Sequence, residues 1–341
     1  MKILFLTRLF YPHVGGVEKH VLELSKILLK KGHRVTVITT KHDDLLSYRD
    51  TVHGINIFRF KQPKIKYFGL LYTWYWLLQN KSLIKESDVI HMHDVFIWYL
   101  PFRLLLPNKK VYTTFHGQWG KYPLSFNDIL QKKLATKLST GNICIGDYIQ
   151  KNYGLKADII SYGATKLAKK FVSKKKNLVV YVGRLDIDIS LPLFLKMLKR
   201  YHDSNHGNGI KVIFCGGGVL SKECENYGEV LGFTDPTPYY EKAKFCFASG
   251  YLTILEALVH KCLVFVVYKN PLQKDYYTLT PFNKFIVIAS NPDDLFKKFK
   301  YYSKNQKLTE KRIEDGYNWV KTQTWEKMAS SYLKLWNLQK I

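Results

Sequence analysis

Acidic residues are scarce in this sequence, and their scarcity narrows the range of expected partners. The 341-residue chain has 27 Asp and Glu residues against 53 Lys and Arg, a formal net charge of +26. Such a charge favours anionic partners, namely nucleic acid, acidic lipid head groups or phosphorylated small molecules. The charge does not choose among them, and a Lys-rich solvated surface explains it equally well.

Cysteine is also sparse, and its spacing argues against disulfides and structural zinc. No CxxC or CxH pair occurs, and several of the cysteines lie in apolar runs, where cysteine behaves as a small hydrophobe. The five cysteines are Cys144, Cys215, Cys224, Cys246 and Cys262.

Long apolar runs are absent as well. No uninterrupted run approaches the roughly 20 residues that span a bilayer, and the opening "MKILFLT" is too short for a signal peptide. We therefore expect a cytoplasmic protein, either soluble or peripheral on the inner face of the membrane.

Predicted strands alternate with helical segments, a pattern typical of parallel sheets. A chain of this length holds about two domains of roughly 150 residues. The basic stretch 166–176 is interpreted as a linker between domains 1–165 and 177–322. We expect an α/β fold with two doubly wound Rossmann-like domains facing across a cleft, and ligands at the carboxyl ends of the strands. The predicted strands are 2–7, 34–39, 55–60, 88–93, 110–115, 142–145, 177–182, 210–215, 244–248, 262–267 and 285–289.

The GxGxxG dinucleotide fingerprint is missing, but "YPHVGG" (11–16) joins the first predicted strand to a helix. Gly15 and Gly16 would let the backbone approach a ligand, and the helix start would offer free N–H groups to an anion. An ordinary glycine-rich turn explains the spacing equally well.

Histidines follow two predicted strands, at "HMHD" (91–94) and "TFHG" (114–117). His91 and His93 share one strand face, yet no third metal ligand is evident, so strand-end histidines beside a cleft are the preferred interpretation. A neutral imidazole at His116 could donate to a sugar hydroxyl or a carbonyl. The acidic pair in "DID" (186–188) is interpreted as solvated, and no metal is expected.

The second half contains an arginine and two glycine-rich turns at predicted strand ends. Arg184 in "VGR" suits phosphate recognition, and "FCGGGVL" (214–220) includes Gly217. In "ASGYLTILEALV" (248–259) a turn at Gly250 starts an almost wholly apolar helix. Glu256 is its one carboxylate, and a nucleotide with phosphate at the helix start and ribose further along would suit both features. A core glutamate satisfied by backbone or an arginine is the alternative.

Taken together, these motifs resemble the retaining glycosyltransferases of the GT-B fold, family 4. The resemblance covers nearly the whole chain and depends on the order and spacing of its motifs. They are "FYPHVGGVEKHVLELSKILLKKGHRVTVIT", "DVIHMHD", "TTFHG", "SYGA", "YVGRL", "GGG", "LGF", "YYEKAKFCFASG" and "LTILEAL". The segment 323–341 is similar to the family's last helix, which crosses back to the N-terminal domain.

The resemblance implies a nucleotide-sugar donor, a glycan or lipid-linked acceptor, no metal or other cofactor, and retention of anomeric configuration. By position, Gly15 and Gly16 would approach the donor phosphates or acceptor, His116 would contact the donor sugar, and Arg184 would bind the diphosphate. The N–H groups near Tyr251 and Leu252 would bind it too, and Glu256 would hold the ribose.

Two positions depart from the family pattern. Ile189 stands where the family has a lysine, and Ala248 where it has a glutamate. Lys269 or Lys274 could replace the missing cation. A catalytically degenerate GT-B subunit that binds a partner or membrane is therefore the alternative function, whereas nucleic-acid binding has no recognisable motif to support it.

Basic residues flank an aromatic core in "KQPKIKYFGLLYTWYWLLQNKSLIK" (61–85), which suggests peripheral contact with an anionic membrane. The competing interpretation, slightly favoured, is that Phe68, Leu71, Trp74 and Leu78 face the protein core. Tyr72, Tyr75 and Trp76 are harder to place inside.

Overall fold

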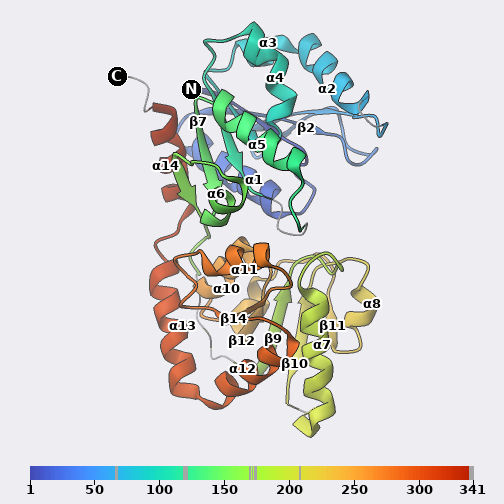
Figure 1. The fold of residues 1–341 in the computed structure, drawn as a ribbon, viewed down its shortest axis with the longest axis vertical. Coiled ribbons are helices and arrows are strands. Elements are labelled where there is room, and N and C mark those ends of the chain that lie inside the picture. The colour runs from blue at the N-terminus through green and yellow to red at the C-terminus, as the bar shows by residue number, and fades with distance from the viewer. Residues whose placement is uncertain are drawn as a thin grey trace. The chain divides into compact units, whose positions relative to one another are not determined.

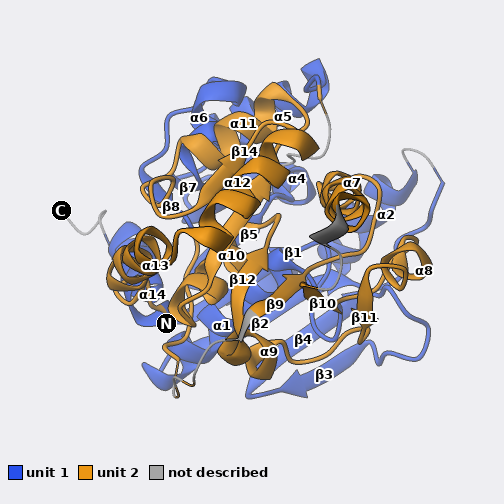
Figure 2. Cartoon of the chain, turned by 90° about the horizontal axis from the view of Figure 1, so that it is seen from below, with its two compact units in different colours: residues 1–118, 123–162, 325–341 blue, residues 119–122, 163–324 orange. Residues whose placement is uncertain are grey.

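The computed structural model describes residues 1–65, 68–117, 122–168, 170, 172, 175–206 and 209–337. The chain forms two compact units, shown in different colours in Figure 2: 1–118 with 123–162 and 325–341, and 119–122 with 163–324. Parts of three predicted segments lie outside the described residues: 66 and 67, four linker positions (169, 171, 173 and 174), and 338–341.

The described residues of the first unit form an eight-stranded sheet in the order β3-β4-β2-β1-β5-β6-β7-β8. Figure 1 shows the ribbon from the side, and Figure 2 labels most strands of this sheet. All neighbouring strands are parallel except the β3–β4 pair. The strands are β1 (Lys2–Thr7), β2 (Arg34–Thr40), β3 (Arg49–Val52), β4 (Ile55–Phe60), β5 (Val89–His93), β6 (Val111–Phe115), β7 (Gly141–Ile145) and β8 (Ile159–Ser161). The helices are α1 (Gly16–Lys30), α2 (Phe68–Gln79), α3 (Lys81–Lys85), α4 (Phe96–Leu105), α5 (Phe126–Leu138), α6 (Asp147–Tyr153) and α14 (Trp325–Asn337).

Strand order determines where a ligand can approach this sheet. The chain leaves β1 toward β2 but leaves β5 toward β6, in the opposite direction, so right-handed crossovers place α1 and α4 on opposite faces. The contacts agree, because α14 packs on α1 whereas α4 packs on α2 and α5. The order therefore reverses between β1 and β5, which is where an open parallel sheet usually binds its ligand.

The second unit has a six-stranded sheet within its described residues, all parallel, in the order β11-β10-β9-β12-β13-β14. Strand side chains such as Val179, Phe247 and Phe265 pack with Phe194 and Leu198 of α7 in one hydrophobic core. The strands are β9 (Lys175–Val182), β10 (Lys211–Cys215), β11 (Gly228–Val230), β12 (Ala243–Phe247), β13 (Leu263–Val267) and β14 (Val287–Ala289). The helices are α7 (Leu191–Tyr201), η1 (His202–His206), α8 (Ser221–Cys224), α9 (Thr237–Lys242), α10 (Tyr251–Val259), α11 (Pro271–Thr278), α12 (Pro292–Lys304) and α13 (Gln306–Val320).

All eleven predicted strands are confirmed, with boundaries that differ by at most two residues at either end. Three short strands, β3, β8 and β11, were not predicted. Each has three or four residues and lies at an edge of its sheet, where too few side chains are buried to produce an apolar run.

Helix α2 buries a different face from the one predicted. Phe68, Leu71 and Leu78 are 53%, 55% and 40% exposed, and Tyr75 lies with them at the surface. The buried residues are small or few, namely Gly69, Thr73 and Leu77. The interpretation that Phe68, Leu71 and Leu78 face the core is therefore wrong, since helical spacing alone does not decide which of two apolar faces meets the protein. In the described residues, no helix is long and apolar enough to cross a membrane.

The C-terminal helix α14 is held to the first unit by a chain of buried hydrogen bonds. The Trp336 indole can only donate, and its Nε1 lies 3.1 Å from Nδ1 of His91. His91 must therefore donate from Nε2 to the Thr114 hydroxyl, 2.7 Å away. The hydroxyls of Thr114 and Tyr332 lie 2.7 Å apart, and the Tyr332 hydroxyl lies 2.9 Å from Nε2 of His20. Because His91 accepts at Nδ1 and donates at Nε2, its imidazole must be neutral.

Replacing Tyr332 with phenylalanine should destabilise the first unit. Tyr332→Phe removes the link between His20 and Thr114 while keeping the ring, and a buried polar group left without its partner costs about 1–3 kcal/mol. Chemical denaturation followed by circular dichroism measures the loss.

The control is Ser330→Ala on the exposed face of the same helix, where the hydroxyl bonds only to the Glu326 carbonyl. If both variants unfold at the same denaturant concentration as the wild type, the hydrogen-bond chain does not stabilise α14.

Candidate functional site

Polar side chains gather where β5 and β6 end in the first unit. Nδ1 of His93 lies 3.0 Å from Nε2 of His116, so only Nδ1 of His116 can meet a ligand. The backbone N–H of His116 donates to Asp94 at 3.0 Å, and the Tyr148 hydroxyl donates to the His116 carbonyl at 2.9 Å. His20, on α1, places its ring edge-on to His116 with 5.0 Å between centroids. The predicted sugar-contacting histidine is therefore held from several sides beside the start of α1.

Burial keeps these histidines uncharged. It lowers the pKa values of His20, His91 and His93 well below the ordinary 6.5, and neighbouring histidines lower them further. Burial also lowers the pKa of His116 to about 4, although Asp94 acts in the opposite direction. At neutral pH His116 can therefore either donate or accept a hydrogen bond, as contact with a neutral sugar requires.

The glycine loop before α1 is partly filled by the chain itself. Gly15 is the N-cap in extended conformation, and a Cβ added there would collide with the carboxylate of Glu18. Glu18 is buried and lies 3.1 Å from His13, and burial raises its pKa. Gly16, by contrast, faces open space. Sequence reasoning missed Glu18, and an acidic residue in the first turn after a glycine pair was the available signal.

Arg184 follows β9 in the second unit and is already paired. Its guanidinium donates to Asp186 and to Asp188, both at 2.9 Å, while its side chain stays 53% exposed. Burial acts to lower the pKa of Arg184, but the carboxylates of Asp188 and Asp186 have the larger effect together, and the pKa lies above its usual value. Asp186 and Asp188, which were predicted to be solvated, thus form ion pairs with Arg184, and a diphosphate that bound Arg184 would have to replace them. Among the described residues no group of three His, Cys, Asp or Glu side chains could hold a metal ion.

Of the two candidate cations, Lys269 forms a side-chain hydrogen bond with the loop that carries Arg184. Its ammonium donates to the backbone carbonyl of Asp188 at 2.6 Å, next to Ile189. Lys274 is exposed on α11. Ile189 and Ala248 are themselves buried, at 4% and 0% exposure. Neither family position therefore points a polar group at a ligand, and Lys269 is the cation best placed to act for the missing lysine.

The start of α10 lies beside the end of β9, because the Thr253 hydroxyl reaches the Val182 carbonyl at 3.5 Å. Leu252, Thr253 and Glu256 are half-buried along one side of this helix, whereas Ile254 and Leu255 are buried. The carboxylate that seemed out of place in an apolar helix thus lies on its more accessible side, one turn after Thr253.

The glycines of the second unit differ in what they allow. A Cβ at Gly250 would meet nothing within 4 Å, so this N-cap is open. A Cβ at Gly217 would press on the Phe233 ring at 3.0 Å. The N–H of Tyr251, predicted to bind phosphate, instead donates to the Tyr276 hydroxyl at 2.9 Å, and the two rings stack at 3.9 Å.

Comparison with known proteins finds a family model that matches part of the chain and solved structures that share its fold. Residues 14–159 match the model of Glycosyltransferase Family 4. The phosphatidylinositol N-acetylglucosaminyltransferase GPI3 subunit of Saccharomyces cerevisiae (strain YJM789) is 26% identical over 210 residues, covering 54% of this chain and 46% of that protein. The gpi3 subunit of the Schizosaccharomyces pombe enzyme is 25% identical over 87 residues, covering 25% and 19%. The chain thus spans about half or less of the length of these curated relatives.

Solved structures share the architecture along the whole chain. Sucrose-phosphate synthase from Thermosynechococcus elongatus has a TM-score of 0.75 at 15% identity, covering 99% of this chain and 98% of that one. HepE from Anabaena, in complex with UDP and glucose, has a TM-score of 0.70 at 13% identity, covering 98% and 99%. At such identities the likeness establishes the fold alone.

Stability should fall in mild acid. The four histidines have folded-state pKa values below 6.5, so they add stability that is complete above about pH 6.5 and is lost as the unfolded chain takes up protons below it. His116 alone, at about 4, contributes up to about 3 kcal/mol of this loss, at about 1.36 kcal/mol per pKa unit. Thermal unfolding measured from pH 8 to 5 tests this.

A matched control is His202→Gln, which replaces a histidine of the second unit and should leave the pH dependence unchanged. His93→Gln should flatten it. A melting temperature that stays constant between pH 7 and 5 in the wild type would contradict the account.

Proposed function

We propose that this chain is a glycosyltransferase of the GT-B fold that moves a sugar from a nucleotide-sugar donor to a glycan or lipid-linked acceptor. The observation that carries the proposal is the meeting of Arg184 and α10 at the carboxyl end of β9, joined through Thr253 and Val182. A guanidinium and a carboxylate so arranged suit the diphosphate and ribose of one nucleotide.

The donor contacts follow from these positions. Arg184 binds the diphosphate after exchanging Asp186 and Asp188 for phosphate oxygens, with Lys269 as the second cation. Glu256 accepts hydrogen bonds from the ribose hydroxyls. In the first unit, His116 contacts the donor sugar through Nδ1, and the open face of Gly16 lets a ligand approach the start of α1.

The transfer retains anomeric configuration and needs no metal. The C1–O bond to the diphosphate breaks, a bond forms from the acceptor oxygen to C1 on the same face, and the acceptor proton passes to a diphosphate oxygen. The nucleoside diphosphate leaves with that proton. The protein contributes positioning and stabilisation of the developing diphosphate charge.

The relatives support a lipid acceptor and a specific donor class. Two of them are phosphatidylinositol N-acetylglucosaminyltransferase subunits, and HepE was solved with UDP and glucose. UDP-N-acetylglucosamine is therefore the first donor to test, and a lipid carrying a polyol head group the first acceptor.

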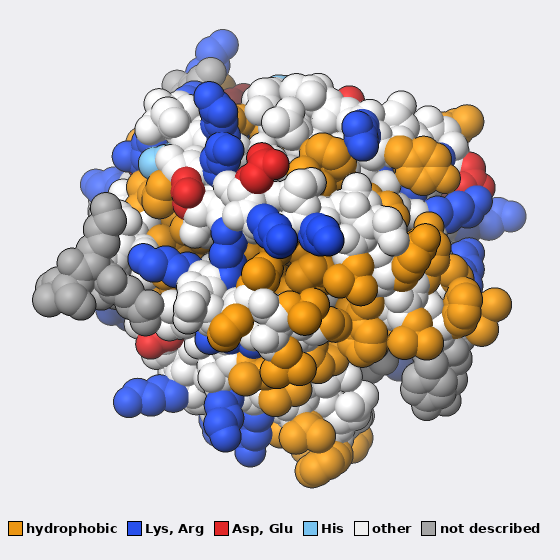
Figure 3. Space-filling view, turned by 90° about the horizontal axis from the view of Figure 1, so that it is seen from above, with side chains coloured by type: hydrophobic (Ala, Val, Ile, Leu, Met, Phe, Trp, Pro, Cys, Tyr) orange, Lys and Arg blue, Asp and Glu red, His pale blue; other side chains and the backbone are white. Residues whose placement is uncertain are grey.

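A lipid acceptor fits the proposed peripheral contact with an anionic membrane. Phe68, Leu71, Tyr75 and Leu78 expose an apolar side of α2, and segment 61–85 has five lysines and no acidic residue. Figure 3 shows a broad hydrophobic patch with Lys and Arg side chains around it, on the side of the first unit where α2 and α4 lie in Figure 1. Aromatic residues favour the bilayer interface, and lysines favour acidic head groups.

A non-catalytic binding subunit is the second candidate, and the residues expected to bind the donor favour it. Ile189 and Ala248 are buried apolar residues, Arg184 has two carboxylate partners, and the N–H of Tyr251 is occupied by Tyr276. Nucleotide binding separates the two candidates, because a subunit that has lost its donor site would not be stabilised by any nucleotide.

Glu256→Gln should weaken nucleotide binding while the fold stays intact. Hydrogen bonds to a charged group contribute about 1.5–3 kcal/mol, so the dissociation constant should rise roughly 10- to 150-fold. Thermal-shift titration against UDP-, GDP-, ADP- and dTDP-sugars measures it, since ligand at 100 times its dissociation constant adds about 2.7 kcal/mol of stability.

The matched control is Glu229→Gln, on the edge strand β11 of the same unit, which should bind nucleotide as the wild type does. Unchanged affinity in a folded Glu256→Gln protein would remove the ribose assignment. The absence of any nucleotide shift in the wild type would favour the non-catalytic subunit.

Leu71→Asp should reduce membrane binding at least tenfold. The substitution removes an exposed apolar side chain whose burial contributes about 1.5–3 kcal/mol, and it adds a negative charge that acidic lipid head groups repel. Sedimentation with liposomes is the measurement. Wild-type binding should rise with acidic lipid and fall with salt, since the attraction is screened beyond about 8 Å at physiological ionic strength.

Leu308→Asp, at an exposed leucine of the second unit, provides the control and should bind as the wild type does. Equal recovery of the wild type from neutral and acidic liposomes would leave a soluble acceptor as the better assignment.

A further inference from the structure

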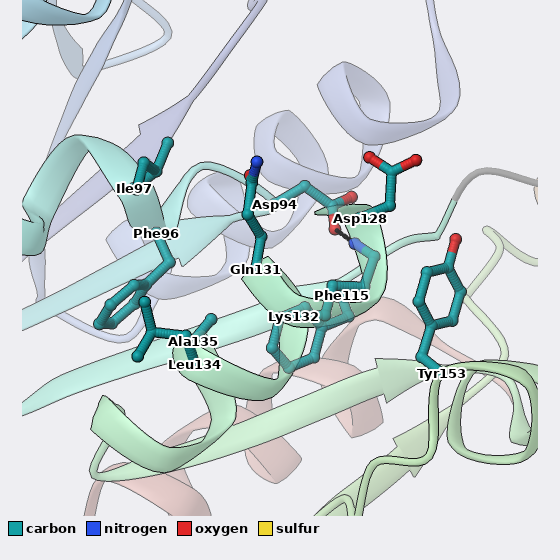
Figure 4. Close-up of a pocket in the computed structure, with 10 residues that line it drawn as sticks. All are labelled: Asp94, Phe96, Ile97, Phe115, Asp128, Gln131, Lys132, Leu134, Ala135 and Tyr153. Carbon is teal, nitrogen blue, oxygen red and sulfur yellow. Dashed lines mark hydrogen bonds and ion pairs between the residues drawn. The ribbon is translucent and has the colours of Figure 1, made fainter. Parts of the chain in front are cut away.

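A pocket in the first unit lies between α4 and α5, over the ends of β5 and β6 (Figure 4). Its cavity volume is about 90 Å³, and it opens to solvent. Phe115, Ala135 and Tyr153 are buried at its floor, whereas Gln131 and Leu134 lie at its rim. No motif in the sequence indicated this pocket, because its walls come from four separate elements.

The polar end of the pocket is an ion pair that neutralises itself. The Lys132 ammonium lies 2.8 Å from Asp94 and over the rings of Phe115 and Tyr153, each at 5.3 Å. Burial acts to raise the pKa of Asp94, but Lys132 and His116 bring it below its ordinary value. Burial acts to lower the pKa of Lys132, and Asp94 raises it above its ordinary value. Both groups are therefore charged at neutral pH and cancel one another.

This polar end lies next to the residue predicted to meet the donor sugar. One oxygen of Asp94 accepts the Lys132 ammonium and the other accepts the backbone N–H of His116. Asp94 is also held in the left-handed region, at a φ of 60°. A molecule whose polar group reached Lys132 and Asp94 would thus lie one hydrogen bond from the backbone N–H of His116, whose ring lies against His93 and His20.

An apolar stripe borders the pocket along α5. Phe126, Leu130 and Leu134 are spaced four residues apart, so they share one helix face. Their exposed fractions are 79%, 51% and 36%, falling toward the leucine that lines the pocket. At the end of the neighbouring α4, Leu104 and Leu105 are 80% and 63% exposed. A hydrocarbon chain leaving the pocket would therefore meet apolar side chains rather than water alone.

We propose that this pocket binds the acceptor as an amphiphile, with a neutral hydroxylated head group at Lys132 and Asp94 and its apolar chain along the α5 stripe. This inference rests on the proposed glycosyl transfer, because only in that reaction would the bound amphiphile be the acceptor. Hydroxyl groups can bond to the carboxylates of Asp94 and Asp128 and to the amide of Gln131. An anionic head group would meet those two carboxylates, while the lysine is already paired.

Alkyl glucosides test the site without any donor. The full chain is titrated with hexyl and octyl β-glucoside below their critical micelle concentrations, and binding is measured by isothermal titration calorimetry and ligand-observed NMR. Each added methylene should tighten binding up to about fourfold, the equivalent of about 0.8 kcal/mol. Glucose alone should bind far more weakly. Equal affinity for the two chain lengths would overturn the apolar part of the proposal.

A matched pair of variants locates the binding. Gln131→Trp fills the rim of the pocket, whereas Lys133→Trp places the same ring on the exposed side of the same helix that faces away from the pocket. We expect Gln131→Trp to weaken octyl glucoside binding at least tenfold and Lys133→Trp to leave it unchanged. Leu134→Asn, which adds polarity without bulk, should weaken binding as well. If both pocket variants bind as the wild type does, the assignment of this pocket fails.

Octyl sulfate distinguishes the class of head group. It should associate with surface lysines, and Gln131→Trp should not change that association. If octyl sulfate binding falls by the same factor as octyl glucoside binding, the neutral head group is wrong. Because none of these measurements uses a nucleotide, alkyl glucoside binding without sugar transfer would contradict the proposed function and leave the pocket assignment standing.

Discussion

The first unit depends on the chain of buried hydrogen bonds that joins Trp336, His91, Thr114, Tyr332 and His20. Because the indole can only donate, His91 must accept at Nδ1 and donate from Nε2 to Thr114. The chain attaches α14 to β5, β6 and α1 through His91, Thr114 and His20; β5 ends at His93, and His116 follows β6. It also requires a neutral imidazole at His91, and burial lowers the pKa values of His91 and His20. The same feature thus holds the last helix in place and prepares the strand ends for uncharged ligands.

Charge inside the protein is compensated, although the surface is strongly basic. Arg184 has Asp186 and Asp188, and Lys132 has Asp94, so the two best-placed cations of the candidate sites each have a carboxylate partner. The consequences differ. At Arg184, which is half exposed, the diphosphate of the proposed donor would replace the carboxylates. Lys132 is 12% exposed and packed on two rings, so its pair is retained and favours a neutral ligand.

The sequence was a poor guide where one segment offered two apolar faces. In α2 nearly every position is apolar or aromatic, so the helical period identifies a helix without identifying its buried side. The neighbouring helix α4 determines which side of α2 is buried, because the Trp74 indole donates a hydrogen bond to the Ile97 carbonyl of α4 at 2.9 Å. The pocket beside α5 was invisible for a related reason, since Phe96, Phe115, Lys132 and Tyr153 are brought together only by the packing of their elements.

The sequence by itself determined the strands, the two Rossmann-like units and the placing of Arg184, His116 and Glu256 at strand ends or helix starts. Burial of whole strands and glycine at turns are local properties, and local patterns record them. Only the tertiary structure decided which of these groups already have partners within the protein. Asp188 forms an ion pair with Arg184, the Tyr276 hydroxyl accepts the N–H of Tyr251, and the Glu18 carboxylate lies against Gly15. These contacts join residues through side-chain direction and packing, which no spacing along the chain specifies.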